Sequence, residues 1–115
     1  DDSAQDRKIV KRFLNKAGYE NLVFAETGEE GIQRAEAEEP ELIITDTRLP
    51  GIDGFEVCRQ IREKNFLFNP KLIIITGAID AVDAVRARRM GADDYCAKTS
   101  DFTPLIEAVG QILGK

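Results

Sequence analysis

Two short apolar runs constrain the fold of this chain more than any other feature. They cover residues 42–46 and 71–76, and each ends in a polar residue, Asp46 or Thr76. A strand is apolar on both faces of its pleat when helices cover both sides of the sheet. The two runs therefore predict buried strands in the middle of a parallel sheet.

Segments with helical periodicity alternate with such runs along the chain. Strand–helix alternation with short connections implies a parallel sheet covered on both faces. At 115 residues, the chain predicts one α/β domain over residues 1–115. Further strands are expected at residues 22–25 and 94–97, and helices at residues 4–17, from Thr27, from Phe55, through Val82 to Met90 and from Thr103.

Several residues predict how these helices begin and pack. Thr27 and Glu30 have the spacing of a capping box, and Thr103 is expected as an N-cap with Pro104 in the first helical position. In the first helix, one apolar face is predicted toward the core: Ile9, Val10, Phe13, Leu14 and Ala17.

Composition excludes several classes of function. The chain has 16 Lys and Arg against 21 Asp and Glu, a net charge of −5, which argues against direct binding of nucleic acid. No apolar run approaches the ~20 residues that span a membrane. There is no histidine, so imidazole bases and histidine metal ligands are excluded. Cys58 and Cys96 lack a CxxC partner and are interpreted as buried apolar residues in a reducing cytoplasm.

Polar residues stand where the predicted strands end. These are Asp46, Thr76 and Lys98, with Asp1 and Asp2 at the start of the first helix. Ligands of open parallel sheets bind at the carboxyl ends of the strands. Each residue alone could be a solvated end residue. Together, three carboxylates favour Mg²⁺, and an ammonium and a hydroxyl group favour a phosphoryl group beside it.

These residues belong to a longer ordered pattern. It comprises Asp1-Asp2, the segment 46–54 (Asp-Thr-Arg-Leu-Pro-Gly-Ile-Asp-Gly), Thr76-Gly77, and the segment 91–95 (Gly-Ala-Asp-Asp-Tyr) running into Lys98. Asp46 and Thr76 are 30 residues apart, and Thr76 and Lys98 are 22 apart. In this order and spacing the chain resembles the receiver domain of two-component response regulators, the CheY-like family, from Asp1 to Leu113.

The resemblance implies a flavodoxin-like, doubly wound (βα)5 fold with strand order 2-1-3-4-5. It implies that Asp46 is the phosphoacceptor, and that Mg²⁺ is bound by Asp1, Asp2, Asp46 and the backbone carbonyl of Arg48. The residues implied to contact the phosphoryl group are Thr76, Lys98, Thr47 and Gly77, and those implied to act in the conformational switch are Thr76 and Tyr95.

The function implied is a phosphorylation-dependent signalling switch in the cytoplasm rather than an enzyme. Its only reactions would be self-phosphorylation from a donor and slow autodephosphorylation. The implied partners are a sensor histidine kinase or a histidine phosphotransfer protein, and a downstream output protein or domain. Neither nucleic acid nor a membrane is an expected partner, and a homodimer through the face between the fourth and fifth helices is possible.

Two departures from the family pattern bear on these expectations. The family has a hydrophobic strand before the acidic pair, in the centre of the sheet, whereas this sequence begins at Asp1. We expect the natural protein to extend further, or another chain to supply that strand, since its loss leaves both neighbouring strands unpaired. The family also has proline after the lysine, where Thr99 follows Lys98 here, so a trans peptide bond is expected.

Two rival functions come from other classes. A pseudo-receiver would share the fold and bind partners without phosphorylation, and the missing proline is its only support. A phosphohydrolase with an aspartate nucleophile would need a general acid two residues after Asp46, where this chain has Arg48. In receiver domains the residues two positions after Asp46 and Thr76, here Arg48 and Ala78, tend to tune loss of the phosphoryl group.

Overall fold

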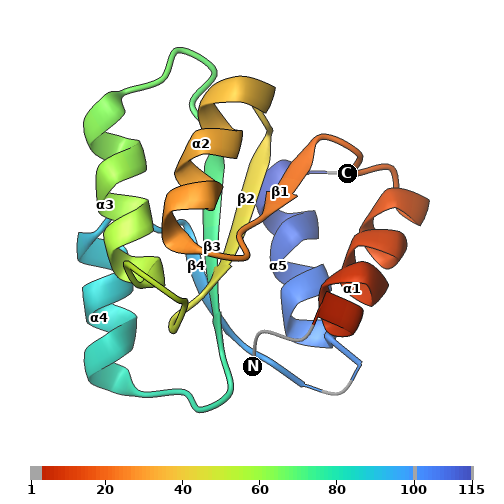
Figure 1. Ribbon diagram of the computed structural model, residues 1–115. Helices are drawn as coiled ribbons and strands as arrows, with labels where there is room; N and C mark the ends of the chain where they lie inside the picture. The colour runs from red at the N-terminus through yellow and green to blue at the C-terminus, as the bar shows by residue number, and fades with distance from the viewer. Residues whose placement is uncertain (1–3, 100, 115) are drawn as a thin grey trace.

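A parallel sheet forms the centre of the protein, and helices cover both of its faces (Figure 1). The computed structural model describes residues 4–99 and 101–114. The strands lie in the order β1 (Leu22–Phe24), β2 (Leu42–Asp46), β3 (Lys71–Thr76) and β4 (Asp94–Ala97). The helices are α1 (Ala4–Lys16), α2 (Gly28–Glu38), α3 (Gly54–Lys64), α4 (Ala81–Arg89) and α5 (Thr103–Leu113). This confirms the predicted flavodoxin-like α/β architecture.

The two apolar runs build a separate core on each face of the sheet. Leu42 and Ile44 of β2 pack on one face with α1 and α5, while Ile43 packs on the other face with α2, α3 and α4. The same alternation holds in β3, where every residue from Leu72 to Ile75 is fully buried. Strands buried on both faces have nearly continuous apolar runs, here Leu42–Ile44 and Leu72–Ile75, which confirms the prediction.

The strands adjoining the expected missing strand are not left unpaired. β1 pairs directly with β2 in parallel register, with Leu22 beside Leu42 and Phe24 beside Ile44. Taking the first strand out of the order 2-1-3-4-5 leaves 2-3-4-5, which is the order found here. The expectation that these two strands would lack hydrogen-bonding partners was therefore wrong for this structure, because they pair with each other.

Only part of the predicted apolar face of α1 is buried. Val10 and Leu14 are fully buried against the core that α1 shares with α5. Ile9 and Phe13 are 38% and 52% exposed, and Ala17 is exposed just after the helix. The face that contacts the sheet is thus narrower than the periodicity predicts, because two residues four apart suffice to fill the contact.

Two predicted helix starts differ in detail from the structure. The Thr27 hydroxyl accepts the amide hydrogen of Glu30 at 3.0 Å, but one carboxylate oxygen of Glu30 is buried without a hydrogen-bond partner. Only half of the capping box therefore forms. At α5 the N-cap residue is Phe102, in a left-handed conformation (φ 58°), and not Thr103, which already lies in the helix. Burial of the Phe102 ring accounts for this start.

The described part of the chain has two other features relevant to function class. None of its helices is long and apolar enough to cross a membrane. Cys58 and Cys96 are free, buried thiols, and burial raises the pKa of each to about 12. Both thiols are protonated near neutral pH, which confirms that they serve as apolar residues.

We predict that substitution of Gly54 at the start of α3 destabilises the fold. A Cβ atom at this position would lie 2.1 Å from the carbonyl oxygen of Asp46. Gly54→Ala should therefore lower the free energy of unfolding by about 1–3 kcal/mol, measured by urea denaturation. Gly110→Ala, within α5, is the matched control, because the nearest atom to a Cβ there is the Tyr19 hydroxyl oxygen at 3.9 Å. The free energy of unfolding of the control should rise by up to about 1 kcal/mol. An unchanged free energy of unfolding in Gly54→Ala would contradict the close approach to Asp46.

Candidate functional site

The parallel register brings three of the predicted residues to one edge of the sheet. Asp46, the last residue of β2, pairs with Ile75, and Thr76, the last residue of β3, pairs with Ala97. Lys98 follows Ala97, and its amide hydrogen is donated to the carbonyl oxygen of Thr76 at 2.7 Å. The carboxyl ends of three successive strands therefore carry a carboxylate, a hydroxyl and an ammonium group side by side.

Asp46 and Lys98 form a buried ion pair. The Nζ atom of Lys98 lies 3.2 Å from Oδ1 of Asp46, and the two side chains are only 11% and 5% exposed. Burial raises the pKa of the Asp46 carboxyl, and the Lys98 ammonium opposes that rise. The Asp46 carboxyl group is thus poorly solvated, and the Lys98 ammonium donates a hydrogen bond to its Oδ1 at 3.2 Å.

The Thr76 hydroxyl is held locally rather than by Asp46. It donates to the carbonyl oxygen of Ala78 at 3.1 Å and accepts the amide hydrogen of Ala78 at 3.2 Å. Thr76 is 8% exposed and lies at the floor of a cleft that also reaches Asp46. These two bonds are short-range, so the hydroxyl can exchange them for another partner without disturbing the strand.

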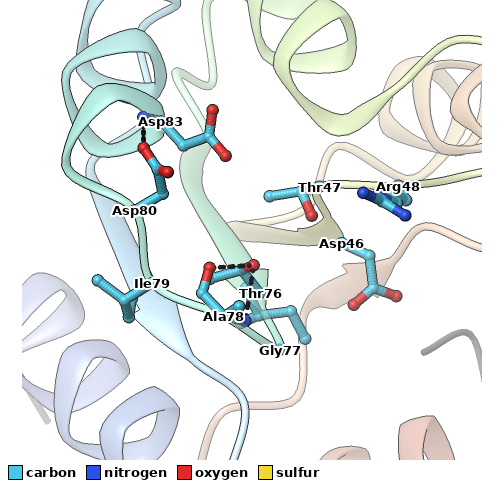
Figure 2. A pocket seen from close by; sticks show the side chains of 10 residues that line it. Asp46, Thr47, Arg48, Thr76, Gly77, Ala78, Ile79, Asp80 and Asp83 are labelled. Atoms are coloured by element: carbon cyan, nitrogen blue, oxygen red, sulfur yellow. Dashed lines mark hydrogen bonds between the residues drawn. The ribbon is translucent and has the colours of Figure 1, made fainter.

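An open cleft of about 500 Å³ lies over this edge of the sheet (Figure 2). One wall follows β2 and holds Asp46, Thr47 and the exposed Arg48. The other wall follows β3 and runs from Gly77 through Ile79 into α4. The predicted residues Thr47 and Gly77 therefore do line the cleft. The Thr47 amide hydrogen, donated to the carbonyl oxygen of Ile75 at 3.1 Å, fixes the first wall to the sheet.

Two acidic residues of the second wall, Asp80 and Asp83, were missed from sequence. Asp80 caps α4, its Oδ1 accepting the amide hydrogens of Val82 at 2.8 Å and of Asp83 at 3.2 Å. An aspartate directly before a helical segment is an N-cap signal that could have placed Asp80. Its position in the cleft depends on where α4 packs, which no local pattern reveals.

Tyr95 lies in β4, three residues before Lys98, and packs against the core. Its ring is partly buried against the core cluster beneath α3 and α4. Its hydroxyl oxygen is buried and has no hydrogen-bond partner among the described residues. A buried hydroxyl group without a partner costs free energy, so this side chain would gain by moving to one.

The expected metal ligands are only partly placed by the structure. Asp1 and Asp2 lie outside the described residues, and the residues that are described contain no group of three or more acidic, cysteine or histidine side chains that could hold a metal ion. Asp46 and Arg48 nevertheless line the same cleft. A carboxylate and a backbone carbonyl are hard oxygen donors of the kind Mg²⁺ prefers, so the donors present fit this ion.

The loop after Lys98 agrees with one expectation. The described residues contain no cis peptide bond, so Lys98 and Thr99 are joined in the trans form. The substitution of threonine for the family's proline therefore leaves the Lys98 side chain in place beside Asp46.

A covered parallel sheet with a buried acid–ammonium pair at its carboxyl edge defines the class of flavodoxin-like domains that bind ligands at that edge. Comparison with known families then identifies the particular one. Residues 1–110 match the response regulator receiver domain model. The chain belongs to this family, and is a receiver domain of the two-component response regulators.

Curated relatives agree with this assignment. Over 104 residues the chain is 36% identical to the alkaline phosphatase synthesis transcriptional regulatory protein PhoP of Bacillus subtilis, covering 90% of this chain and 41% of PhoP. It is 39% identical over 92 residues to the transcriptional regulatory protein AfsQ1 of Streptomyces coelicolor, covering 80% and 39%. The chain therefore spans about two fifths of the length of these relatives.

Solved structures agree as well. A LuxR-family two-component response regulator from Aurantimonas superposes with a TM-score of 0.86 at 28% identity, covering 99% of this chain and 81% of that one. Response regulator TrrA of Thermotoga maritima, solved in complex with Mg²⁺ and BeF, gives a TM-score of 0.80 at 32% identity, covering 96% and 92%.

We predict that Lys98→Met destabilises the domain in a pH-dependent way. At pH 7 the change leaves the buried Asp46 carboxylate without this cation, and should lower the free energy of unfolding by about 3–5 kcal/mol. The pKa of Asp46 is already raised by burial, and loses an opposing cation in this variant. The folded state then binds a proton more readily than the unfolded state, so the loss shrinks as pH falls through the raised pKa.

Thermal unfolding of the wild type and of Lys98→Met between pH 7 and pH 5 checks this. Lys71→Met is the control, since Lys71 begins β3 at the opposite edge of the sheet from Asp46. A deficit that is independent of pH would contradict the account of the ion pair.

Proposed function

We propose that this receiver domain is a phosphorylation-dependent switch in which Asp46 accepts the phosphoryl group. The observation that carries the proposal is the buried Asp46 carboxylate, 3.2 Å from the Lys98 ammonium and open to the cleft. Phosphoryl transfer depends on positioning and charge neutralisation more than on proton-transfer groups. A chain without histidine is therefore equipped for this chemistry if the donor is on another molecule.

The proposed transfer is a single displacement at phosphorus. A carboxylate oxygen of Asp46 attacks the phosphorus of a phosphohistidine or of a small acyl phosphate. The bond from phosphorus to the donor's nitrogen or oxygen breaks, and its electron pair leaves with the donor. An aspartyl phosphate remains, and no proton has to be removed from the nucleophile.

Mg²⁺ is the proposed cofactor of this step. Asp46 and the backbone carbonyl of Arg48 would hold it together with Asp1 and Asp2, which the family pattern places at the same edge. When bound, the ion supplies positive charge that neutralises the phosphoryl oxygens. The TrrA structure, which was solved with Mg²⁺, supports the same assignment by similarity.

Charge and hydrogen bonding on the protein then favour the phosphorylated state. Lys98 exchanges its partner from a carboxylate oxygen to a phosphoryl oxygen, and Thr47 and Gly77 offer polar groups along the cleft. The Thr76 hydroxyl leaves Ala78 for another phosphoryl oxygen.

The switch follows from the movement of Thr76. Tyr95 starts from a half-buried position, with no hydrogen-bond partner for its hydroxyl among the described residues, and moves further toward the space that Thr76 leaves. The new charge at Asp46 thus biases the domain between two packings of the same side chains.

The partners follow from this reaction. A sensor histidine kinase or a phosphotransfer protein supplies the phosphoryl group in the cytoplasm, and an output domain or protein reads the conformation. The relatives' names describe transcriptional regulators, which supports an output in transcription through a part of the protein other than this domain. We also propose a homodimer through the α4–α5 face. In this proposal the domain is not an enzyme that turns over external substrates.

We predict that a small acyl phosphate labels the wild type but not Asp46→Asn. Intact-mass spectrometry after incubation with acetyl phosphate and Mg²⁺ should show one labile phosphoryl adduct, and chelation of Mg²⁺ should abolish it. The amide of the variant is isosteric with the carboxylate but is not a nucleophile. Glu107→Gln, the same exchange at an exposed position of α5, is the control and should be labelled like the wild type.

The same experiment separates the rival functions. A folded wild type that never forms the adduct would contradict the proposal and favour a pseudo-receiver. Repeated hydrolysis of phosphate esters would favour a phosphohydrolase.

A further inference from the structure

Beyond the paired ends of β2 and β3, residues of two different elements line the cleft beside Asp46. Thr47 and Arg48 belong to the loop between β2 and α3, whereas Asp80 and Asp83 belong to the first turns of α4 and its cap. Figure 2 shows Asp80 and Asp83 across the cleft from Thr47, so the position of α4 relative to the start of α3 affects the width of the cleft.

Helix α4 is held by very little apolar burial. Ala87 is the one buried residue of its described span, while Val82 and Val85 are 75% and 53% exposed. Helix α3, by contrast, buries Phe55, Val57, Cys58 and Ile61. A helix with so small a buried face needs other side-chain contacts to fix its position.

Arg86 of α4 supplies such contacts at the start of α3. Its guanidinium carbon lies 4.3 Å from the centre of the Phe55 ring, and a guanidinium nitrogen lies 3.6 Å from Oδ2 of Asp53. Both partners are themselves fixed. Phe55 is 4% exposed in the core, and the other oxygen of Asp53 caps α3 by accepting the Glu56 amide hydrogen at 2.9 Å.

The contacted residues also end the loop that begins at the acceptor. The Gly54 amide hydrogen is donated to the carbonyl oxygen of Thr47 at 3.1 Å, so the end of the loop is tied to the residue after Asp46. A planar guanidinium group can stack on a ring while pairing with a carboxylate, which an ammonium group cannot reproduce.

We propose that Arg86 is a positioning residue for phosphoryl transfer to Asp46. By bridging Asp53 and Phe55, it holds the first turn of α4 at a set distance from the β2–α3 loop, and so sets the opening through which the donor reaches the acceptor. This inference rests on the proposed function of Asp46. It assigns to Arg86 a role in the reaction rather than in stability alone.

The test is the rate of labelling by acetyl phosphate at saturating Mg²⁺, measured as a function of donor concentration. Arg86→Ala should be labelled about tenfold more slowly at saturating donor, because displacements of about 1 Å cost up to ~100-fold in rate. Arg86→Lys keeps the charge but not the stacking, so its labelling rate should fall between those of the wild type and Arg86→Ala. Arg88→Ala removes the same charge from an exposed position on the same helix, and should match the wild type.

A double-mutant cycle with Phe55→Leu separates positioning from loss of stability. If both side chains act through the stacked contact, the rate of the double variant should be no lower than that of the slower single variant. Rates are compared only at a temperature at which thermal unfolding shows every variant to be folded. If Arg86→Ala is unfolded there, Arg86→Lys takes its place in the comparison.

The outcomes are distinct. Normal labelling of the wild type together with equal rates for Arg86→Ala and Arg88→Ala, or multiplicative effects in the cycle, would overturn this inference alone. A folded wild type that takes up no phosphoryl group would overturn the proposed function and this inference with it.

Discussion

The ion pair between Asp46 and Lys98 is the interaction on which the arrangement of this domain depends. Two opposite charges buried to this degree have to be close and well oriented, because the loss of hydration outweighs a poorly aligned attraction. The parallel sheet meets that requirement by ending β2 and β4 at the same edge, on either side of β3. The chemistry proposed for the site uses the same geometry, with a phosphoryl oxygen taking the place of the carboxylate oxygen beside Lys98.

The sheet and the edge that carries the candidate site were predictable from sequence for a physical reason. Strands buried on both faces have nearly continuous apolar runs, so residues 42–46 and 71–76 were readily predicted as strands, and a parallel arrangement brings their polar ends together. The roles of Asp46 as acceptor and of Asp1 and Asp2 as metal ligands remain predictions, supported by the family resemblance.

The features that could not be predicted from the sequence are those that depend on tertiary contacts. Periodicity placed Phe13 on the apolar face of α1 but could not show that α1 buries only a narrow part of that face. The pairing of β1 with β2 and the left-handed Phe102 at the start of α5 have no local signature. The bridge from Arg86 to α3 likewise depends on where α4 packs. Each of these features depends on contacts between elements that are distant in the sequence, which local patterns do not encode.

Asp46 is the proposed carrier of the phosphoryl group, and chemical trapping of the acyl phosphate tests this assignment. Reduction of the labelled protein with tritiated borohydride converts a phosphorylated aspartate to homoserine, which peptide mapping then locates. We expect the tritium at position 46 and at no other residue of the cleft. Tritium at Asp53, Asp80 or Asp83, with none at position 46, would contradict it.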